Sequence, residues 1–117
     1  MFTREDGTIV CERCTVAETP LRRMKGLLGR SELPVEEGLL LRPGSSIHTF
    51  FMRFPIDAVF LDRDLVVRKV ADNMRPWRLA FARGAHSVLE IAAGESRRRG
   101  LAPGQKLVAA PVDGGRA

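Results

Sequence analysis

The residues best suited to chemistry lie close together in the middle of the chain. His48, Thr49, Arg53 and Asp57 fall within one short stretch. An imidazole and a carboxylate can act in acid–base catalysis or bind a metal ion, so His48 and Asp57 could serve a small hydrolase or a metal-dependent enzyme. The stretch matches no established catalytic motif, however, and a histidine beside Phe and Met is more often a hydrogen-bonded packing residue. We therefore interpret the four residues as candidates for ligand binding and assign no catalytic residue.

Asp57 also has a structural interpretation. It lies between two apolar segments, where a carboxylate needs hydrogen-bond partners or a raised pKa. It follows Pro55 closely, and a short carboxylate at a chain corner can accept the backbone N–H groups that a bend leaves unpaired. We therefore expect Asp57 to be a structural acceptor first and a functional group second.

The two cysteines, Cys11 and Cys14, form a Cys-x-x-Cys pair. Redox pairs of this type begin a helix, and metal sites usually need a second pair or two histidines. Within a regular strand, residues three apart also point to opposite faces, unless a bulge or turn intervenes. We expect structural or incidental thiols that are dispensable for folding, and no metal or other cofactor. A redox pair, or a metal site completed by His48 and His86, is the alternative.

Basic residues give the chain a formal net charge of +5. They gather in three groups: Arg22, Arg23, Lys25 and Arg30; Arg97, Arg98, Arg99 and Lys106; and Arg75, Arg78 and Arg83, which flank Trp77. Such groups could neutralise phosphates while Trp77 stacks on a base. No nucleic-acid-binding motif accompanies them, and basic residues on the outer faces of elements usually face solvent. A small-molecule or protein partner is therefore favoured, with Trp77 as a further ligand-binding candidate and nucleic acid as the less favoured alternative.

The elements that must position these residues are mostly strands. Residues 47–54 and 58–61 are two apolar, β-branched and aromatic runs that we expect to be strands meeting at a corner near Pro55. Residues 62–64 are a connection of hairpin length between 58–61 and a further strand at 65–70. Other strands are predicted at 8–16, 38–41, 87–92 and 106–110, and 71–85 is expected to be a long irregular loop that holds Trp77.

Two short helices complete the predicted elements. Thr19 and Pro20 are typical of a helix N-terminus, and Gly29 is suited to end the helix. The apolar residues of this helix are predicted to form one buried face, made of Leu21, Met24, Leu27 and Leu28. Gly26 inside the helix suggests close approach to another backbone segment. A helical turn is predicted at 94–99, ended by Gly100.

The length of 117 residues suits one domain with its own core, and 44% hydrophobic with 28% charged residues argues against both disorder and membrane insertion. We expect a mainly β fold bordering on α+β, a small barrel-like or closed-sandwich domain with two short helices, whose core spans about 8–110 and whose tail 111–117 frays. Residues 1–7 contain no signal peptide, so the expected location is cytoplasmic, without a membrane partner.

Three motifs in the chain resemble those of the DUF192 family of uncharacterised prokaryotic proteins. The central motif runs from Ile47 to Asp62; Lys25-Gly26-Leu27-Leu28-Gly29-Arg30 precedes it and Val88-Leu89-Glu90-Ile91-Ala92-Ala93-Gly94 follows it. The resemblance spans roughly Val16 to Val108 and implies a small β-rich, barrel-like single domain without an established activity.

Taken together, the sequence favours a non-enzymatic ligand-binding or accessory module. The ligand is expected to enter near the central corner and the loop that carries Trp77. The alternatives from other classes are the hydrolase or metal-dependent enzyme and the nucleic-acid backbone binder. The sequence indicates neither the ligand nor the oligomeric state.

Overall fold

The computed structural model describes residues 1–110, with the side chains of residues 20, 23 and 24 set aside. Its central sheet has five strands, in the order β3 (Arg13–Ala17), β4 (Glu37–Leu41), β9 (Ser87–Ala92), β6 (Ile56–Leu61) and β7 (Val67–Met74). The β3–β4 pair is parallel, and the other neighbours are antiparallel. β9 therefore occupies the middle of the sheet.

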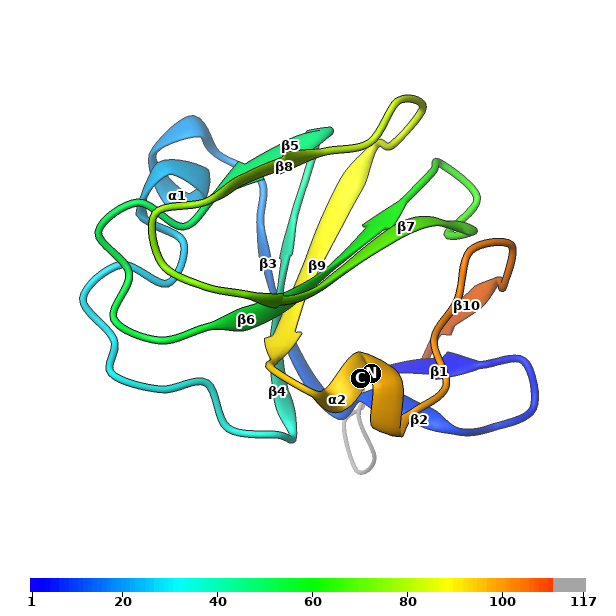
Figure 1. Cartoon of the computed structure of the whole chain (residues 1–117). Helices are drawn as coiled ribbons and strands as arrows, with labels where there is room; N and C mark the ends of the chain where they lie inside the picture. The colour runs from blue at the N-terminus through cyan, green and yellow to red at the C-terminus, as the bar shows by residue number, and fades with distance from the viewer. Residues whose placement is uncertain (111–117) are drawn as a thin grey trace.

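A smaller sheet lies on each side of this central sheet, as Figure 1 shows. One has three strands, in the order β10 (Leu107–Ala109), β1 (Phe2–Arg4) and β2 (Ile9–Cys11); the other pairs β5 (Ser46–His48) with β8 (Leu79–Phe81). Alternate side chains of β6 enter two different cores. Phe60 packs toward β5 and β8 in the first core, and Val59 packs toward the three-stranded sheet in the second core. Because both faces are covered, β6 and β9 are almost continuously buried.

The mainly β class with two short helices is confirmed, but the sheets do not close into a barrel. The predicted hairpin is also confirmed. β6 and β7 pair antiparallel, and Oδ1 of Asp62 accepts the backbone N–H groups of Asp64 at 2.8 Å and Val66 at 3.0 Å. The strands predicted at 38–41 and 87–92 are β4 and β9. The expected fraying of 111–117 lies outside the described residues.

The opening strand predicted over residues 8–16 is wrong as a single element. A bend at Glu12 divides it into β2 and β3, which belong to different sheets. β1 also lies before residue 8, where we expected the core to begin, and it pairs with β10 at the other end of the chain. Apolar composition predicts extended backbone, but pairing between distant segments decides which sheet each half joins.

Two predictions around the central stretch also change. β5 ends at His48, so residues 49–55 are turns and loop rather than the second half of a strand. Phe51 has φ of 67°, which a regular strand cannot contain. The segment 71–85 is more regular than predicted, because β7 continues to Met74 and β8 pairs with β5. The irregular part that holds Trp77 is reduced to residues 75–78.

Helix α1 (Pro20–Lys25) begins as predicted, with Oγ1 of Thr19 accepting the Arg22 N–H at 3.1 Å. It ends earlier than predicted, because Gly26 caps it with φ of 47° and donates its N–H to the Arg22 carbonyl. The helix is therefore too short to bring all four predicted apolar residues to one face. Helix α2 (Glu95–Arg98) lies where the second helical turn was predicted.

The early end of α1 explains the positions of the leucines that we predicted for this helix. Leu27 lies in the turn after the helix and is buried in the core, and Leu28 is half-buried beside it. Leu21 is 77% exposed, so its predicted burial is wrong. The prediction for Met24 concerns a side chain outside the described set.

Candidate functional site

Thr49 joins the two loops that carry most of the sequence-predicted residues. Its hydroxyl donates to the Arg75 carbonyl at 2.5 Å and accepts the Arg78 N–H at 2.9 Å. Its backbone N–H donates to the Arg78 carbonyl, and its carbonyl accepts the Trp77 N–H at 3.0 Å. Thr49 is fully buried. The structure therefore gives it a structural role, which holds loop 49–55 against loop 75–78.

His48 and Trp77 come together through an aromatic ring between them. The His48 ring stacks on Phe50 with ring centres 4.9 Å apart, and Phe50 stacks on Trp77 with centres 5.8 Å apart. Nδ1 of His48 accepts the Phe50 N–H at 3.3 Å. Arg53 lies exposed on the same loop as Phe50. The His48–Phe50–Trp77 stack is exposed, so two of the five predicted residues share one surface.

Asp57 lies elsewhere, on β6, and is completely buried. Oδ1 accepts the Asn73 N–H at 2.7 Å. Oδ2 accepts the Gly94 N–H at 3.1 Å, and both the N–H and the hydroxyl of Ser96 at 2.8 and 2.6 Å. Asp57 thus connects β6 to β7 and to the start of α2. Among the described residues no hydrogen bond joins it to His48, so the structure does not form a His–Asp pair.

A residue that sequence reasoning missed, Glu90, lines a pocket. It lies on β9 and is directly opposite Leu39 of β4 on one side and Ala58 of β6 on the other. Its side chain points to the same face as Val88, toward the layer formed by β5 and the turn after α1. Only 3% of Glu90 is exposed. Within the described part of the chain, its Oε1 atom is buried and has no hydrogen-bond partner.

Burial also changes the protonation of Glu90. Removal from water disfavours the charged form and raises the pKa of this carboxyl from its ordinary value of 4.5 to about 8. The carboxyl is therefore mostly protonated at neutral pH. In that form it can donate one hydrogen bond and accept others.

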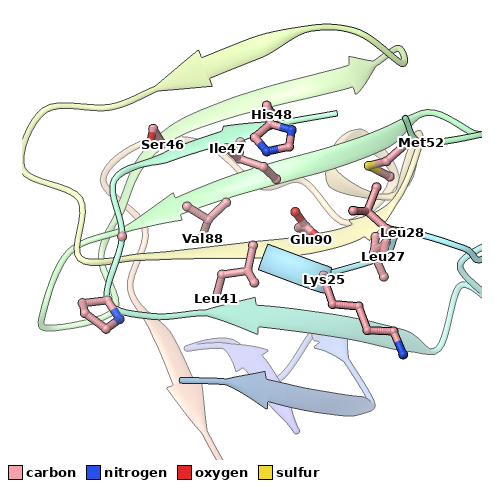
Figure 2. A pocket seen from close by; sticks show the side chains of 13 residues that line it. Lys25, Leu27, Leu28, Leu41, Ser46, Ile47, His48, Met52, Val88 and Glu90 are labelled. Atoms are coloured by element: carbon pink, nitrogen blue, oxygen red, sulfur yellow. The ribbon is translucent and has the colours of Figure 1, made fainter. Parts of the chain in front are cut away.

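The pocket around Glu90 is a cavity of about 210 Å³. Its walls are mostly apolar, made by Leu27, Leu28, Leu41, Ile47, Met52 and Val88. Three exposed polar residues, Lys25, Ser46 and His48, line its outer part. Figure 2 shows Glu90 among the apolar side chains, whereas the Lys25 amine extends away from it. The arrangement can hold a small apolar molecule that forms a hydrogen bond with the carboxyl group.

The sequence did contain a signal for Glu90, namely a carboxylate in the middle of the apolar run 87–92. That run predicts a strand, but it does not show that both faces of the strand are covered. In a strand with one solvent face, Glu90 would simply lie on the exposed side. The carboxylate indicates a buried group only once β9 is known to lie in the middle of a sheet that is covered on both faces.

Comparison with known proteins assigns the chain to a family. Residues 1–109 match the family model DUF192, described as "Uncharacterized ACR". The chain belongs to the DUF192 family. The resemblance of the three sequence motifs to this family is therefore confirmed. Glu90 lies in the third of these motifs.

Three proteins illustrate what this DUF192 domain is similar to. A UPF0127 protein from Thermococcus sibiricus is 31% identical over 101 residues, which cover 80% of this chain and 64% of that protein. A protein of unknown function from Novosphingobium aromaticivorans has a TM-score of 0.75 at 31% identity, over 82% of this chain and 74% of the other. A protein from Sinorhizobium meliloti described as a candidate transcription regulator has the same TM-score at 25% identity, over 81% and 79% of the two chains.

The cysteine pair of the DUF192 domain lies at the break between β2 and β3. Cys11 is buried in the second core and Cys14 is half-buried, and neither forms a disulfide. The bend at Glu12 brings the thiols together despite their spacing. The Cys14 thiol donates a hydrogen bond to the Thr15 carbonyl at 3.8 Å. Interaction with the Cys14 thiol lowers the pKa of Cys11, whereas the same interaction and burial raise the pKa of Cys14. In residues 1–110 no three His, Cys, Asp or Glu side chains are placed to hold a metal ion together.

The predicted basic groups of this DUF192 domain differ in how far their charge is neutralised. Arg97 pairs with Asp72 at 2.9 Å, while Arg98 and Arg99 both pair with Glu95. Arg99 also donates to the Val10 and Val35 carbonyls, so it fixes the structure rather than faces solvent. Arg75, Arg78 and Arg83 are exposed. No helix within the described residues is long and apolar enough to cross a membrane.

Proposed function

We propose that the protein is a non-enzymatic module that binds a small, mostly apolar molecule in the Glu90 pocket. The observation that carries this proposal is the Glu90 carboxyl group, which is buried beside a cavity and leaves Oε1 without a partner among the described residues. A buried polar atom without a partner costs about 1–3 kcal/mol of stability. A ligand that supplies the missing hydrogen bond recovers this energy when it binds.

The chemistry of the pocket limits the ligand. Because the pKa of Glu90 is raised to about 8 by burial, the carboxyl is mainly a hydrogen-bond donor at neutral pH. The walls are apolar, and a cavity of about 210 Å³ is smaller than the roughly 300–1,000 Å³ typical of drug-sized ligands. The favoured ligand therefore has a short apolar body and one neutral hydrogen-bond acceptor, such as a carbonyl or hydroxyl group.

His48 is the sequence-predicted candidate that this proposal retains at the pocket. It lines the outer part of the cavity, where Ser46 and Lys25 are also exposed. In this proposal they border the end of the ligand that still reaches solvent. Asp57 has no such role in the proposal, because both of its oxygens already accept hydrogen bonds from the protein.

An NMR-detected screen of small molecules tests the proposal directly. Short-chain neutral amides, ketones and alcohols are compared with alkylamines and carboxylates of the same skeleton at pH 6.5. We expect the neutral acceptors to shift the methyl signals of Ile47, Met52 and Val88. Glu90→Leu should abolish these shifts while the protein stays folded. The matched control Glu12→Leu, at an exposed position, should leave them unchanged.

The pH dependence of binding then tests the role of the proton. Above about pH 8 the affinity for neutral acceptors should fall about tenfold per pH unit, because the donating proton is lost. An alkylamine should show the opposite trend, since the ionised carboxylate attracts it. Equal binding by wild type and Glu90→Leu, or preferential binding of carboxylates, would contradict the proposal.

A further inference from the structure

One group of exposed hydrophobic side chains lies on the β5–β8 strand pair and its neighbouring loops. Nine large hydrophobic side chains are exposed among the described residues, and five of them belong to this surface. We call this group the aromatic face, consisting of Phe50, Phe51, Trp77, Leu79 and Phe81. Phe51, Trp77, Leu79 and Phe81 are each more than half exposed, at 71%, 56%, 68% and 66%. Exposed apolar groups of this size commonly mark an interaction site.

The aromatic face is continuous across three segments of the chain. Leu79 of β8 is directly opposite His48 of β5, so the two side chains share one side of this strand pair. The His48 ring stacks on Phe50, which in turn stacks on Trp77. Phe51 packs against Trp77 with ring centres 4.6 Å apart. Figure 1 shows that the loops after β5 and before β8 run beside each other.

The protein holds these rings outward rather than letting them fold into the core. Hydrogen bonds of the Thr49 backbone and hydroxyl fix loop 49–55 to loop 75–78. The other side of the β5–β8 pair is already occupied, because Ile47 is buried in the first core beneath it. The exposed rings therefore have no place inside the molecule.

The segments that carry the aromatic face also carry exposed arginines and no carboxylate. Arg53, Arg75, Arg78 and Arg83 are all exposed. No Asp or Glu occurs in residues 46–56 or 75–86. None of the four arginines forms an ion pair within the described part of the chain, in contrast to Arg97, Arg98 and Arg99. The partner of this surface should therefore be both apolar and anionic.

We infer that the aromatic face docks on an anionic phospholipid bilayer. Trp and Phe side chains are favoured at the boundary between headgroups and acyl chains, and arginines beside them attract anionic headgroups. A nucleic acid accounts for less of the surface, since the exposed Leu79 offers no face on which a base can stack. The contact is peripheral. It differs from our expectation of no membrane partner, which rested on the lack of a segment suited to insertion.

Trp77 makes this inference easy to test, because it is the only tryptophan in a chain that has no tyrosine. Its fluorescence is recorded during titration with vesicles of phosphatidylglycerol and phosphatidylcholine, and with vesicles of phosphatidylcholine alone. With the anionic vesicles we expect a blue shift of emission, and quenching when the lipids carry bromine on their acyl chains. High salt should weaken the response, because it screens the arginines.

Variants separate the contribution of charge from that of the rings. Arg75→Ala/Arg78→Ala should weaken partitioning roughly 25-fold, at about fivefold per arginine. Phe51→Ser should reduce the blue shift and the bromine quenching. The matched controls are Arg97→Ala/Arg98→Ala and Ile9→Ser, which remove charge and exposed apolar area outside the aromatic face. They should leave both signals unchanged, and thermal unfolding checks that every variant is folded.

Three outcomes would overturn the inference. One is the absence of a blue shift with anionic vesicles while the protein is folded. Another is quenching of Trp77 by single-stranded oligonucleotides without any response to vesicles, which would identify a nucleic-acid surface. The last is a spectral change with protein concentration alone, which would identify contact between two copies. All of these leave the Glu90 pocket untested, so the two proposals fail separately.

Discussion

Asp57 and Glu90 show two ways in which this fold holds a buried carboxyl group. Both lie on interior strands of the central sheet and are almost fully buried. Asp57 accepts four hydrogen bonds, so its environment is complete without a ligand. Glu90 has an oxygen without a partner among the described residues and faces a cavity. The difference in hydrogen bonding, rather than in burial, separates a structural carboxylate from a candidate binding group.

Removing the Asp57 carboxylate should be costly, because the backbone N–H groups of Asn73, Gly94 and Ser96 lose their acceptor. For Asp57→Ala we expect a loss of about 3 kcal/mol in the free energy of unfolding, and a smaller loss for Asp57→Asn, which keeps one carbonyl acceptor. Urea denaturation measures both. Asp72→Ala serves as the control, since its exposed ion pair with Arg97 should contribute less than about 1 kcal/mol. Wild-type stability in Asp57→Ala would contradict the structural role.

The packing of Cys11 against Gly38 gives a second test at single residues. A Cβ atom at Gly38 would lie 2.6 Å from Sγ of Cys11 and 3.2 Å from the Glu90 carbonyl. Gly38→Ala should therefore lower the free energy of unfolding by about 1–3 kcal/mol. Adding Cys11→Ala should recover part of that loss by removing the sulfur.

A double-mutant cycle in urea isolates this contact. Gly44→Ala is the control, because nothing lies within 4 Å of the position of its Cβ. If Gly38→Ala were as stable as this control, or if Cys11→Ala gave no recovery, the close packing of the sulfur on β4 would be disproved.

At the scale of the elements, α1 and the turn after it form one side of the pocket. Leu27 is 4% exposed and lines the cavity, whereas Leu21 on the helix is 77% exposed. Of these two described leucines, the one in the turn that follows Gly26 makes the connection to the core, and the one on the helix does not.

Truncation of Leu27 and of Leu21 should show that the turn, and not this position on the helix, packs on the core. Leu27→Ala should lower the free energy of unfolding by about 2–5 kcal/mol, because it leaves a void in the first core. Leu21→Ala should change it little, since the side chain is already in water. Chemical denaturation measures both variants under the same conditions. Similar losses at the two positions would mean that the helix packs by a different face.

The elements that the sequence predicted well are those with local signals. The β6–β7 hairpin follows from two apolar runs around Asp62, and the start of α1 follows from Thr19. The split at Glu12 and the brevity of β5 were missed, because they depend on pairing with distant segments. The end of α1 was missed because Gly26, which we placed inside the helix, is its cap. The residues of the candidate site show the same difference between local and distant signals. His48 was identified from its neighbours in the sequence, whereas the burial of Glu90 depends on two layers that meet around β9.

On the scale of the whole molecule, the covered central sheet places a titratable group where protonation affects folding. The +5 net charge and the exposed arginines lie on the surface, where solvent screens their interactions. Glu90 lies between two layers and has no such screening. Its protonation should therefore contribute to global stability in a way that surface groups do not.

The pH dependence of stability should reveal this contribution. The pKa of Glu90 is about 8 in the folded protein and near its ordinary value of 4.5 when unfolded. Between these values the folded state keeps a proton that the unfolded state releases, so stability should fall as pH rises, by up to about 1.4 kcal/mol per pH unit. Glu90→Leu lacks this loss, and it also removes a buried polar atom without a partner. The variant should therefore be more stable than wild type, by a margin that widens from about pH 5 to 8 and is constant above that. Urea unfolding of both proteins across this range measures the margin. The difference between their free energies of unfolding removes the contribution of the other titratable groups, which both proteins share. A margin that did not change with pH would show that Glu90 titrates normally in the folded protein.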